Sequence, residues 1–151
     1  MEKVNVAIVG ATGAVGEVML EILAERQFPV DNLVLLASEN SAGTTLQFKG
    51  KSIRVENLAT FDFSNTHIAL FSAGGSVSAQ FAPIAAAQGC VVIDNTSCFR
   101  RDPSIPLVVP EVNSARIADY VGRNIIANPN CSTIQMLVAL KPIQDAVGIA
   151  R

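Results

Sequence analysis

Residues 3–16 read Lys-Val-Asn-Val-Ala-Ile-Val-Gly-Ala-Thr-Gly-Ala-Val-Gly, and this stretch decides the fold. Its first half is an apolar run that predicts a buried strand, and three glycines then follow at the spacing Gly-x-x-Gly-x-x-Gly. From Val15 onward, apolar residues recur at i, i+3, i+4, i+7 and i+8, which is the period of one helix face. A strand, a glycine-rich turn and a helix in this order predict the first unit of a dinucleotide-binding α/β sheet.

Short apolar runs and helical patterns alternate along the rest of the chain. A hairpin about Gly50 in residues 46–55 is expected to form an antiparallel edge. Helices are expected from Ser76 to a stop at Gly89, from Asn113, and over 132–140. The expected strands are 33–36, 67–71, 90–94, 107–109 and 124–127. This order predicts an α/β fold with a doubly wound, mostly parallel sheet of the Rossmann type.

The composition limits the class of protein. The chain has 151 residues, of which 50% are hydrophobic and 16% charged, with a net charge of −2. These values fit one folded domain and exclude a disordered chain. Because no Lys/Arg-rich block or long apolar span is present, nucleic-acid and membrane partners are not expected. Three cysteines without C-x-x-C spacing and a single histidine indicate a reduced, cytoplasmic setting and no metal site.

The three glycines predict a phosphate-binding turn. Gly10 permits the tight turn, Gly13 lets the backbone approach a pyrophosphate, and Gly16 lets the helix pack against the sheet. The helix N-terminus then offers free N–H groups to the phosphates. The second strand ends in Ala37-Ser38, without the acidic residue that holds the ribose of NAD, and this favours NADP. The alternative is that Glu39 binds the ribose hydroxyls and that NAD is the cofactor.

Cys131 is the candidate nucleophile. It stands directly before the helix expected over 132–140, where the positive end of the helix dipole favours the thiolate. The side-chain amide of Asn130 could bind an oxyanion. A thiolate, an oxyanion donor and a nicotinamide cofactor together indicate covalent aldehyde oxidation through a thioester. The alternative is a buried structural cysteine, which Cys90 exemplifies inside its strand.

Arg100 and Arg101 are candidate substrate ligands. They follow the strand expected over 90–94, at the sheet edge where substrates bind in this architecture. The guanidinium fork suits a carboxylate or a phosphate, and the alternative is a solvated surface pair. His67 opens a strand and is expected to have a structural role.

Six blocks carry a family resemblance. They are Gly-Ala-Thr-Gly-Ala-Val-Gly at 10–16, Leu-Ala-Ser-Glu-Asn-Ser-Ala-Gly at 36–43, Phe-Ser-Ala-Gly-Gly-Ser at 71–76, Asp-Asn-Thr-Ser-Cys-Phe-Arg at 94–100, Val-Val-Pro-Glu-Val-Asn at 108–113 and Asn-Pro-Asn-Cys-Ser-Thr at 128–133. Together they closely resemble aspartate-semialdehyde dehydrogenase over nearly the whole chain. The last block is specific, because the related N-acetyl-γ-glutamyl-phosphate reductases typically carry Gly-Cys-Tyr-Pro-Thr around their cysteine.

The resemblance implies a reaction and its residues. Residues 1–130 would form an NADP-binding Rossmann-like domain, and 131–151 would begin a catalytic and dimerisation domain that is otherwise largely absent. The implied reaction is NADP-dependent reductive dephosphorylation of L-4-aspartyl phosphate to L-aspartate 4-semialdehyde, in lysine, threonine and methionine biosynthesis. Cys131 and Asn130 would be catalytic, and Arg100 would bind the substrate or phosphate. The implied cofactor contacts are Gly10, Thr12, Gly13, Ala14, Val15, Ser38, Asn40, Ser41, Ser72, Gly74 and Gly75.

Two features depart from the family pattern. Asn40 stands where many members carry Arg, which bears on strict NADP preference. The family's chains are much longer, form a homodimer, and place their acid/base histidine beyond the position of Arg151. This chain alone is therefore expected to bind the cofactor without turnover. A stand-alone NADP-binding module and an N-acetyl-γ-glutamyl-phosphate reductase-like enzyme remain alternatives.

Overall fold

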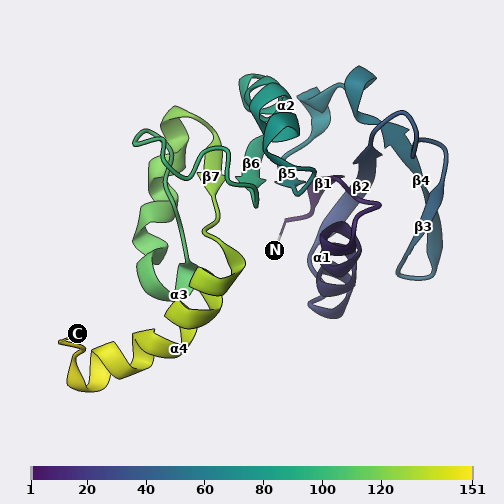
Figure 1. Ribbon diagram of the computed structural model, residues 1–151. Helices are drawn as coiled ribbons and strands as arrows, with labels where there is room; N and C mark the ends of the chain where they lie inside the picture. Colours follow the sequence, from purple (N-terminus) through teal and green to yellow (C-terminus); the bar gives the residue numbers. More distant parts are fainter. Residues whose placement is uncertain (1, 151) are drawn as a thin grey trace.

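The computed structural model describes residues 2–150, which form one seven-stranded sheet between helices (Figure 1). The strand order is β3-β4-β2-β1-β5-β6-β7, and every neighbouring pair is parallel except β3 with β4. The strands are β1 Val4–Val9, β2 Val30–Ala37, β3 Thr45–Phe48, β4 Lys51–Asn57, β5 Ile68–Phe71, β6 Val91–Asp94 and β7 Ile125–Ala127. The helices are α1 Ala14–Glu25, α2 Gly75–Ala87, α3 Pro110–Asn113 and α4 Cys131–Val147, with 3₁₀ turns at Leu58–Thr60, Phe63–Asn65 and Ser114–Gly122.

Both faces of the sheet are covered, and β1 shows this directly. Its side chains alternate between two buried clusters, because successive residues of a strand point to opposite faces. Val6 and Ile8 pack with Leu20 of α1 on one face. Ala7 and Val9 pack on the other face, in the cluster that contains Ala82 of α2. The expectation of a doubly wound, mostly parallel sheet is therefore confirmed.

One expected strand is wrong. Segment 107–109 contributes only an isolated parallel bridge, between Leu107 and Ala127. The side chain of Asn113 accepts a hydrogen bond from the backbone N–H of Val109 at 2.8 Å and donates one to the carbonyl of Leu107 at 3.0 Å. Those groups lie on the edge of the segment that faces away from β7. Toward β7 the segment makes both bonds of the bridge, from the N–H of Val108 to the carbonyl of Ala127 and from the N–H of Ala127 to the carbonyl of Pro106. The ladder stops there because the next donors on either side would be Pro106 and Pro129, which have no N–H.

Helix boundaries also differ from the expectation. The α-helix near Asn113 spans Pro110–Asn113, so it ends where the helix was expected to begin, and Ser114–Gly122 is a 3₁₀ helix. Proline is favoured in the first helical turn, where its missing N–H costs nothing. The helix expected over 132–140 begins at Cys131 and runs through Pro142 to Val147. The hairpin about Gly50 is antiparallel as expected, but β4 also pairs in parallel with β2.

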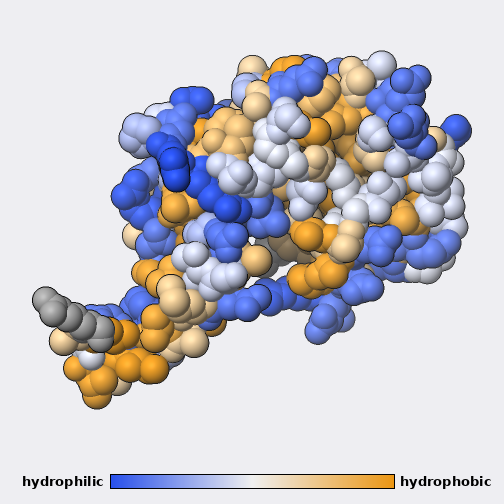
Figure 2. Space-filling view, in the orientation of Figure 1, coloured by the Kyte–Doolittle hydropathy of each residue, from blue (hydrophilic) through white to orange (hydrophobic). Residues whose placement is uncertain are grey.

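Helix α4 leads away from the sheet, and it contacts α3 (Figure 1). Figure 2 shows apolar side chains gathered on the part of the molecule near the C-terminus; exposed apolar residues there are Met136, Val138, Ile143, Val147 and Ile149. In the described residues, no helix combines the length and hydropathy needed to cross a membrane. The division into residues 1–130 and 131–151 stays a prediction, and its outer ends, Met1 and Arg151, lie outside the described residues.

Candidate functional site

A cavity of about 520 Å³ opens at the carboxyl ends of β1, β2 and β5. In an open α/β sheet, ligands bind where the strand order reverses, and here β1 lies between β2 and β5. The cavity is lined by Gly10, Thr12, Gly13, Ala37, Ser38, Glu39, Asn57, Leu58, Ala59, Ser72, Ala73, Val77 and Phe81. Five predicted cofactor contacts are therefore brought together, namely Gly10, Thr12, Gly13, Ser38 and Ser72.

Two glycines of the turn are required by its geometry. Gly10 has φ +88°, a conformation that residues with a Cβ rarely adopt, and a Cβ there would lie 2.8 Å from the carbonyl oxygen of Ser72. A Cβ on Gly16 would lie 2.7 Å from both Cα and O of Ala11 and still closer to the carbonyl oxygen of Gly10. At Gly13 the same test gives 3.4 Å, so a side chain fits there. Gly16 therefore lets α1 approach the backbone of the turn itself.

The N-terminus of α1 is open and points its amides toward the turn. Gly13 is the N-cap and makes no side-chain capping bond, while the first residues, Ala14 and Val15, are exposed. The first backbone N–H groups of a helix have no partner within the helix, and they carry the positive end of its dipole. Such an end fits a phosphate. This donor set, beside a glycine-lined cavity, fits the pyrophosphate of a dinucleotide.

Other predicted cofactor contacts lie around the cavity without lining it. Ala14 and Val15 belong to the α1 terminus, and Asn40 and Ser41 lie in the turn after β2. Gly74, at φ +96°, is the N-cap of α2, and Gly75 begins that helix. Their roles in binding stay predictions.

Sequence reasoning missed the apolar end of the cavity. Asn57, Leu58 and Ala59 reach it because β4 pairs in parallel with β2, so the carboxyl end of β4 arrives at the same sheet edge. Val77 and Phe81 come from α2. The hairpin pattern of residues 46–55 predicts only the antiparallel pair. A parallel pairing of its second strand with β2 would have predicted that the end of this strand lies at the same sheet edge. Glu39, the alternative ribose ligand, also lines the cavity.

Arg100 ties two loops together. Its Nε donates to the carbonyl oxygen of Asn128 at 2.8 Å, and its Nη2 donates to the carbonyl oxygen of Asn95 at 3.0 Å. The first carbonyl precedes the Cys131 helix and the second follows β6. Half-buried Arg100 thus fixes the position of one loop on the other, a function beyond the predicted substrate contact. Among residues 2–150, the Nη1 group of Arg100 donates no hydrogen bond, so this group can donate to a bound anion.

Asp94 anchors the loop that carries Arg100. Its carboxylate is fully buried and accepts hydrogen bonds from the hydroxyl of Ser78 at 2.8 Å, the hydroxyl of Thr96 at 2.8 Å and the amide of Thr96 at 3.1 Å. Its backbone carbonyl accepts from the N–H of Asn128 at 2.8 Å. A buried carboxylate needs such donors to offset the loss of hydration. The sequence pattern alone does not predict this role for Asp94.

Cys131 is exposed and is the first residue of α4. Asn130 is the N-cap: its Oδ1 accepts from the amide of Ser132 at 2.9 Å and lies 3.9 Å from Cys131 Sγ. The capping bond fixes the Asn130 side chain beside the thiol and leaves its Nδ2 group as a donor. The structure therefore brings the two predicted catalytic residues together at a helix N-terminus.

The other two cysteines differ from Cys131 in environment. Burial raises the pKa of the Cys90 thiol to about 12, so it stays protonated and inert. Burial, and then the charge of Asp94, raise the pKa of half-buried Cys98. His67 lies at the amino end of β5, away from the cavity, where its Nδ1 accepts the amide of Asn5 at 2.8 Å. That contact agrees with the structural role expected for it.

Comparison with known proteins matches this chain to one family. A family model described as the NAD-binding domain of semialdehyde dehydrogenase matches residues 5–120. Aspartate-semialdehyde dehydrogenase 2 of Vibrio cholerae is 70% identical over 150 residues, which are 99% of this chain and 44% of that protein. The aspartate-semialdehyde dehydrogenase of Bacillus subtilis is 56% identical over 145 residues, which are 96% of this chain and 41% of that protein.

Solved structures agree with the sequence matches. The crystal structure of aspartate semialdehyde dehydrogenase II of Vibrio cholerae complexed with ASA superposes with a TM-score of 0.95 at 70% identity. The match covers 98% of this chain and 48% of that one. This chain thus spans about half the length of the relatives it matches.

Proposed function

The chain belongs to the semialdehyde dehydrogenase family and contains its NAD-binding domain, and on this premise we propose that it supplies the cofactor site and the nucleophile for converting L-4-aspartyl phosphate to L-aspartate 4-semialdehyde. The reaction is a reductive dephosphorylation that uses NADPH and passes through a cysteine thioester. It belongs to the synthesis of lysine, threonine and methionine. The likeness to enzymes named aspartate-semialdehyde dehydrogenase supports this substrate.

One observation carries the proposal: an exposed cysteine is the first residue of a helix, next to the residue whose side chain caps that helix. Cys131 and Asn130 form this pair. The thiolate is the nucleophilic form of cysteine, and an exposed thiol is open to a substrate. The alternative of a buried structural cysteine fits Cys90 but not an exposed Cys131.

The residues of the chain divide the chemistry among them. The Cys131 thiolate attacks the acyl carbon, the bond from that carbon to the phosphate oxygen breaks, and inorganic phosphate leaves. The aspartyl group is then held as a thioester on Sγ. Asn130 Nδ2 donates to the oxyanion that develops on the acyl oxygen. The free Nη1 of Arg100 binds the phosphate group, while its other donors keep the loops in place.

The cofactor is held at the carboxyl edge of the sheet. When bound, it supplies the hydride that reduces the thioester to the aldehyde, and Cys131 leaves again as the thiolate. Gly10, Thr12 and Gly13 with the α1 terminus hold the pyrophosphate. Ser38 and the turn after β2, including Asn40 and Ser41, hold the ribose of NADP. The lining position of Glu39 supports the alternative of NAD.

Three further statements belong to this proposal. The three free cysteines support a reducing, cytoplasmic location. The exposed apolar residues of α4 support a homodimer in a protein of the relatives' length. The change from cofactor binding to catalysis and dimerisation is proposed to fall between residues 130 and 131.

Thiol alkylation tests the nucleophile in this chain. Folded and urea-unfolded protein are treated with iodoacetamide near neutral pH, and each cysteine peptide is followed by mass spectrometry. Cys131 should react faster in the folded chain than in the unfolded one, because only folding places it at a helix N-terminus. Cys90 and Cys98 should react more slowly when folded, since burial raises their pKa values.

Slower alkylation of Cys131 in the folded chain contradicts its role as nucleophile. In a protein of the relatives' length, Cys131→Ala should also abolish the phosphate-dependent reduction of NADP by aspartate 4-semialdehyde. Activity retained in that variant excludes the thioester route.

A further inference from the structure

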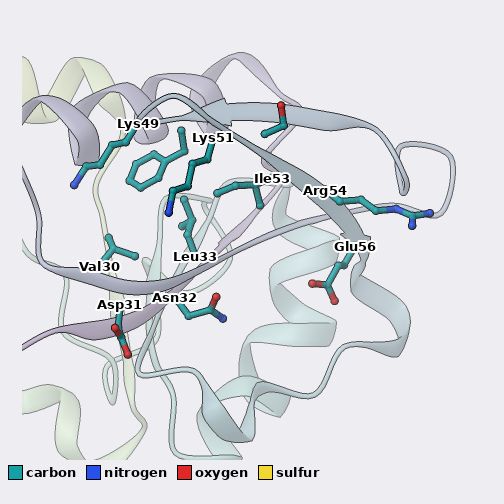
Figure 3. Close-up of a pocket in the computed structure, with 11 residues that line it drawn as sticks. Val30, Asp31, Asn32, Leu33, Lys49, Lys51, Ile53, Arg54 and Glu56 are labelled. Atoms are coloured by element: carbon teal, nitrogen blue, oxygen red, sulfur yellow. The ribbon is translucent and has the colours of Figure 1, made fainter.

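Arg54 reaches from β4 to the turn that follows β2. A Cβ built on Gly43 would lie 3.5 Å from Nη2 and 4.0 Å from Nε of Arg54, so the guanidinium packs on this glycine. Backbone pairing explains the contact, because Thr45 of β3 pairs with Arg54, and the N–H of Gly43, just before β3, donates to the carbonyl of Val55 at 2.8 Å. Figure 3 shows the Arg54 side chain extending away from Lys51 and Leu33.

Lys51 lies on the same strand but points elsewhere. β2 and β4 pair only from Leu35 and Val55 onward, and a cleft of about 600 Å³ separates their earlier residues. In Figure 3 the ammonium group of Lys51 points into this cleft, toward Leu33. Arg54 also lines this cleft, but its guanidinium lies against Gly43, beside a second hollow that Lys51 does not line.

The turn that Arg54 contacts needs a cation if it is to hold a phosphate. Residues 38–44 read Ser-Glu-Asn-Ser-Ala-Gly-Thr, with one acidic and no basic side chain. Glu39 lines the cofactor cavity, and its negative charge would repel a phosphate group bound at this turn. Within residues 2–150, Arg54 takes part in none of the ion pairs, so its charge is not consumed by a carboxylate.

The surroundings of Arg54 join the cofactor cavity. A hollow of about 430 Å³ is lined by Ala42, Gly43, Arg54, Val55, Glu56 and Asn57. Asn57, the last residue of β4, also lines the cofactor cavity, so the two spaces share this residue of their walls. In this architecture the adenosine ribose lies at the end of β2, and an arginine nearby accommodates a 2′-phosphate.

We propose that Arg54 is the residue that selects NADP over NAD, by binding the 2′-phosphate of the adenosine ribose across the turn at Gly43. The inference rests on the proposed dinucleotide site, and it names the cation that the turn itself lacks. The guanidinium donates hydrogen bonds to the phosphate oxygens while its charge offsets that of Glu39.

Calorimetry of four chains tests this assignment with NADP and NAD, which differ only in the 2′-phosphate. The chains are the wild type, Arg54→Ala, Arg54→Lys and Lys51→Ala. Arg54→Ala should weaken NADP binding about 10-fold, as expected for losing a charged hydrogen-bond partner, and leave NAD binding unchanged. Arg54→Lys should lie between, because lysine keeps the charge without the fork. Lys51→Ala changes the net charge equally and should leave the preference intact.

Each result decides the assignment. Equal preference in the wild type and Arg54→Ala overturns it, as does an equal loss of NADP binding in Lys51→Ala, which would indicate general electrostatics only. If the wild type prefers NAD yet Arg54→Ala still weakens NADP, Arg54 binds the 2′-phosphate and the proposed NADP dependence fails. A folded wild-type chain that binds neither dinucleotide overturns both.

Discussion

Gly16→Ala should destabilise the chain, because one added methyl group has no space. The new Cβ would lie 2.7 Å from Cα and O of Ala11 and nearer still to the oxygen of Gly10. This backbone cannot easily shift, since the amides of Gly10 and Ala11 both donate to the carbonyl of Leu36, at 2.9 and 3.2 Å. Relief must come from moving α1 away from the turn.

Two opposing effects set the magnitude. Overpacking of a close-packed site costs about 1–3 kcal/mol, and replacing glycine by alanine inside a helix returns up to about 1 kcal/mol. Because the clash is with backbone rather than with a flexible side chain, we expect a net loss of about 2 kcal/mol in the free energy of unfolding. For a chain of this size the midpoint should fall by about 4–8 °C.

Gly13→Ala is the matched control in the same turn. Its backbone is extended, at φ −88° and ψ 160°, and the nearest atom to a new Cβ is 3.4 Å away. Its midpoint should stay within about 3 °C of the wild type, while its methyl group should weaken dinucleotide binding. Calorimetric unfolding of the three chains gives the comparison. Equal midpoints for both variants would refute the steric argument.

Two further predictions concern the nucleophile loop and a buried thiol. Arg100→Ala should lower the alkylation rate of Cys131 toward that of the unfolded chain, because the hydrogen bonds to the carbonyls of Asn95 and Asn128 are lost. Arg101→Ala should leave that rate unchanged. Equal effects of the two variants would show that the charge of the arginine, not the position of the loop, sets the rate. The unfolding free energy should fall as pH rises from 9 to 12, since the Cys90 thiol ionises near 9.0 when unfolded and near 12 when folded. Cys90→Ala should reduce that slope in urea titrations, and an unchanged slope would be evidence against burial as its cause.

Periodicity was sufficient for the elements that pack through side chains. The β1–α1 unit and the strand at Val91–Asp94 were predicted because buried strands and amphipathic helices leave a repeating apolar pattern. Segment 107–109 has the same apolar composition, but Pro106 and Pro129 stand on either side of its single bridge to β7 and have no N–H with which to extend it. Apolar periodicity takes no account of missing N–H donors, so the strand was expected wrongly.

The candidate site was predictable where chain order alone sets position. Gly10, Gly13 and Cys131 stand at a strand or helix end, and these ends fall within about one residue of where the sequence places them. Leu58 and Asn57 depend instead on which strand neighbours β2, and the loop-binding role of Arg100 depends on two carbonyls 5 and 28 residues away. Pairings across the sheet are not encoded locally, so these roles required the structure.

A series of hydrogen bonds connects the sheet edge where the cofactor is proposed to bind to the loop that precedes Cys131. The carbonyl of Phe71, which precedes Ser72 in the cavity wall, accepts the amide of Asn95 at 2.9 Å. Asn95 is held by Arg100, which also holds Asn128, two residues before the Asn130 cap. In the proposed reaction the bound groups must meet within a fraction of an ångström, and we propose that this connection sets the distance from the cofactor to the thiol. The loop after β6 therefore positions the segment that leads to Cys131, in addition to the substrate contact proposed for Arg100.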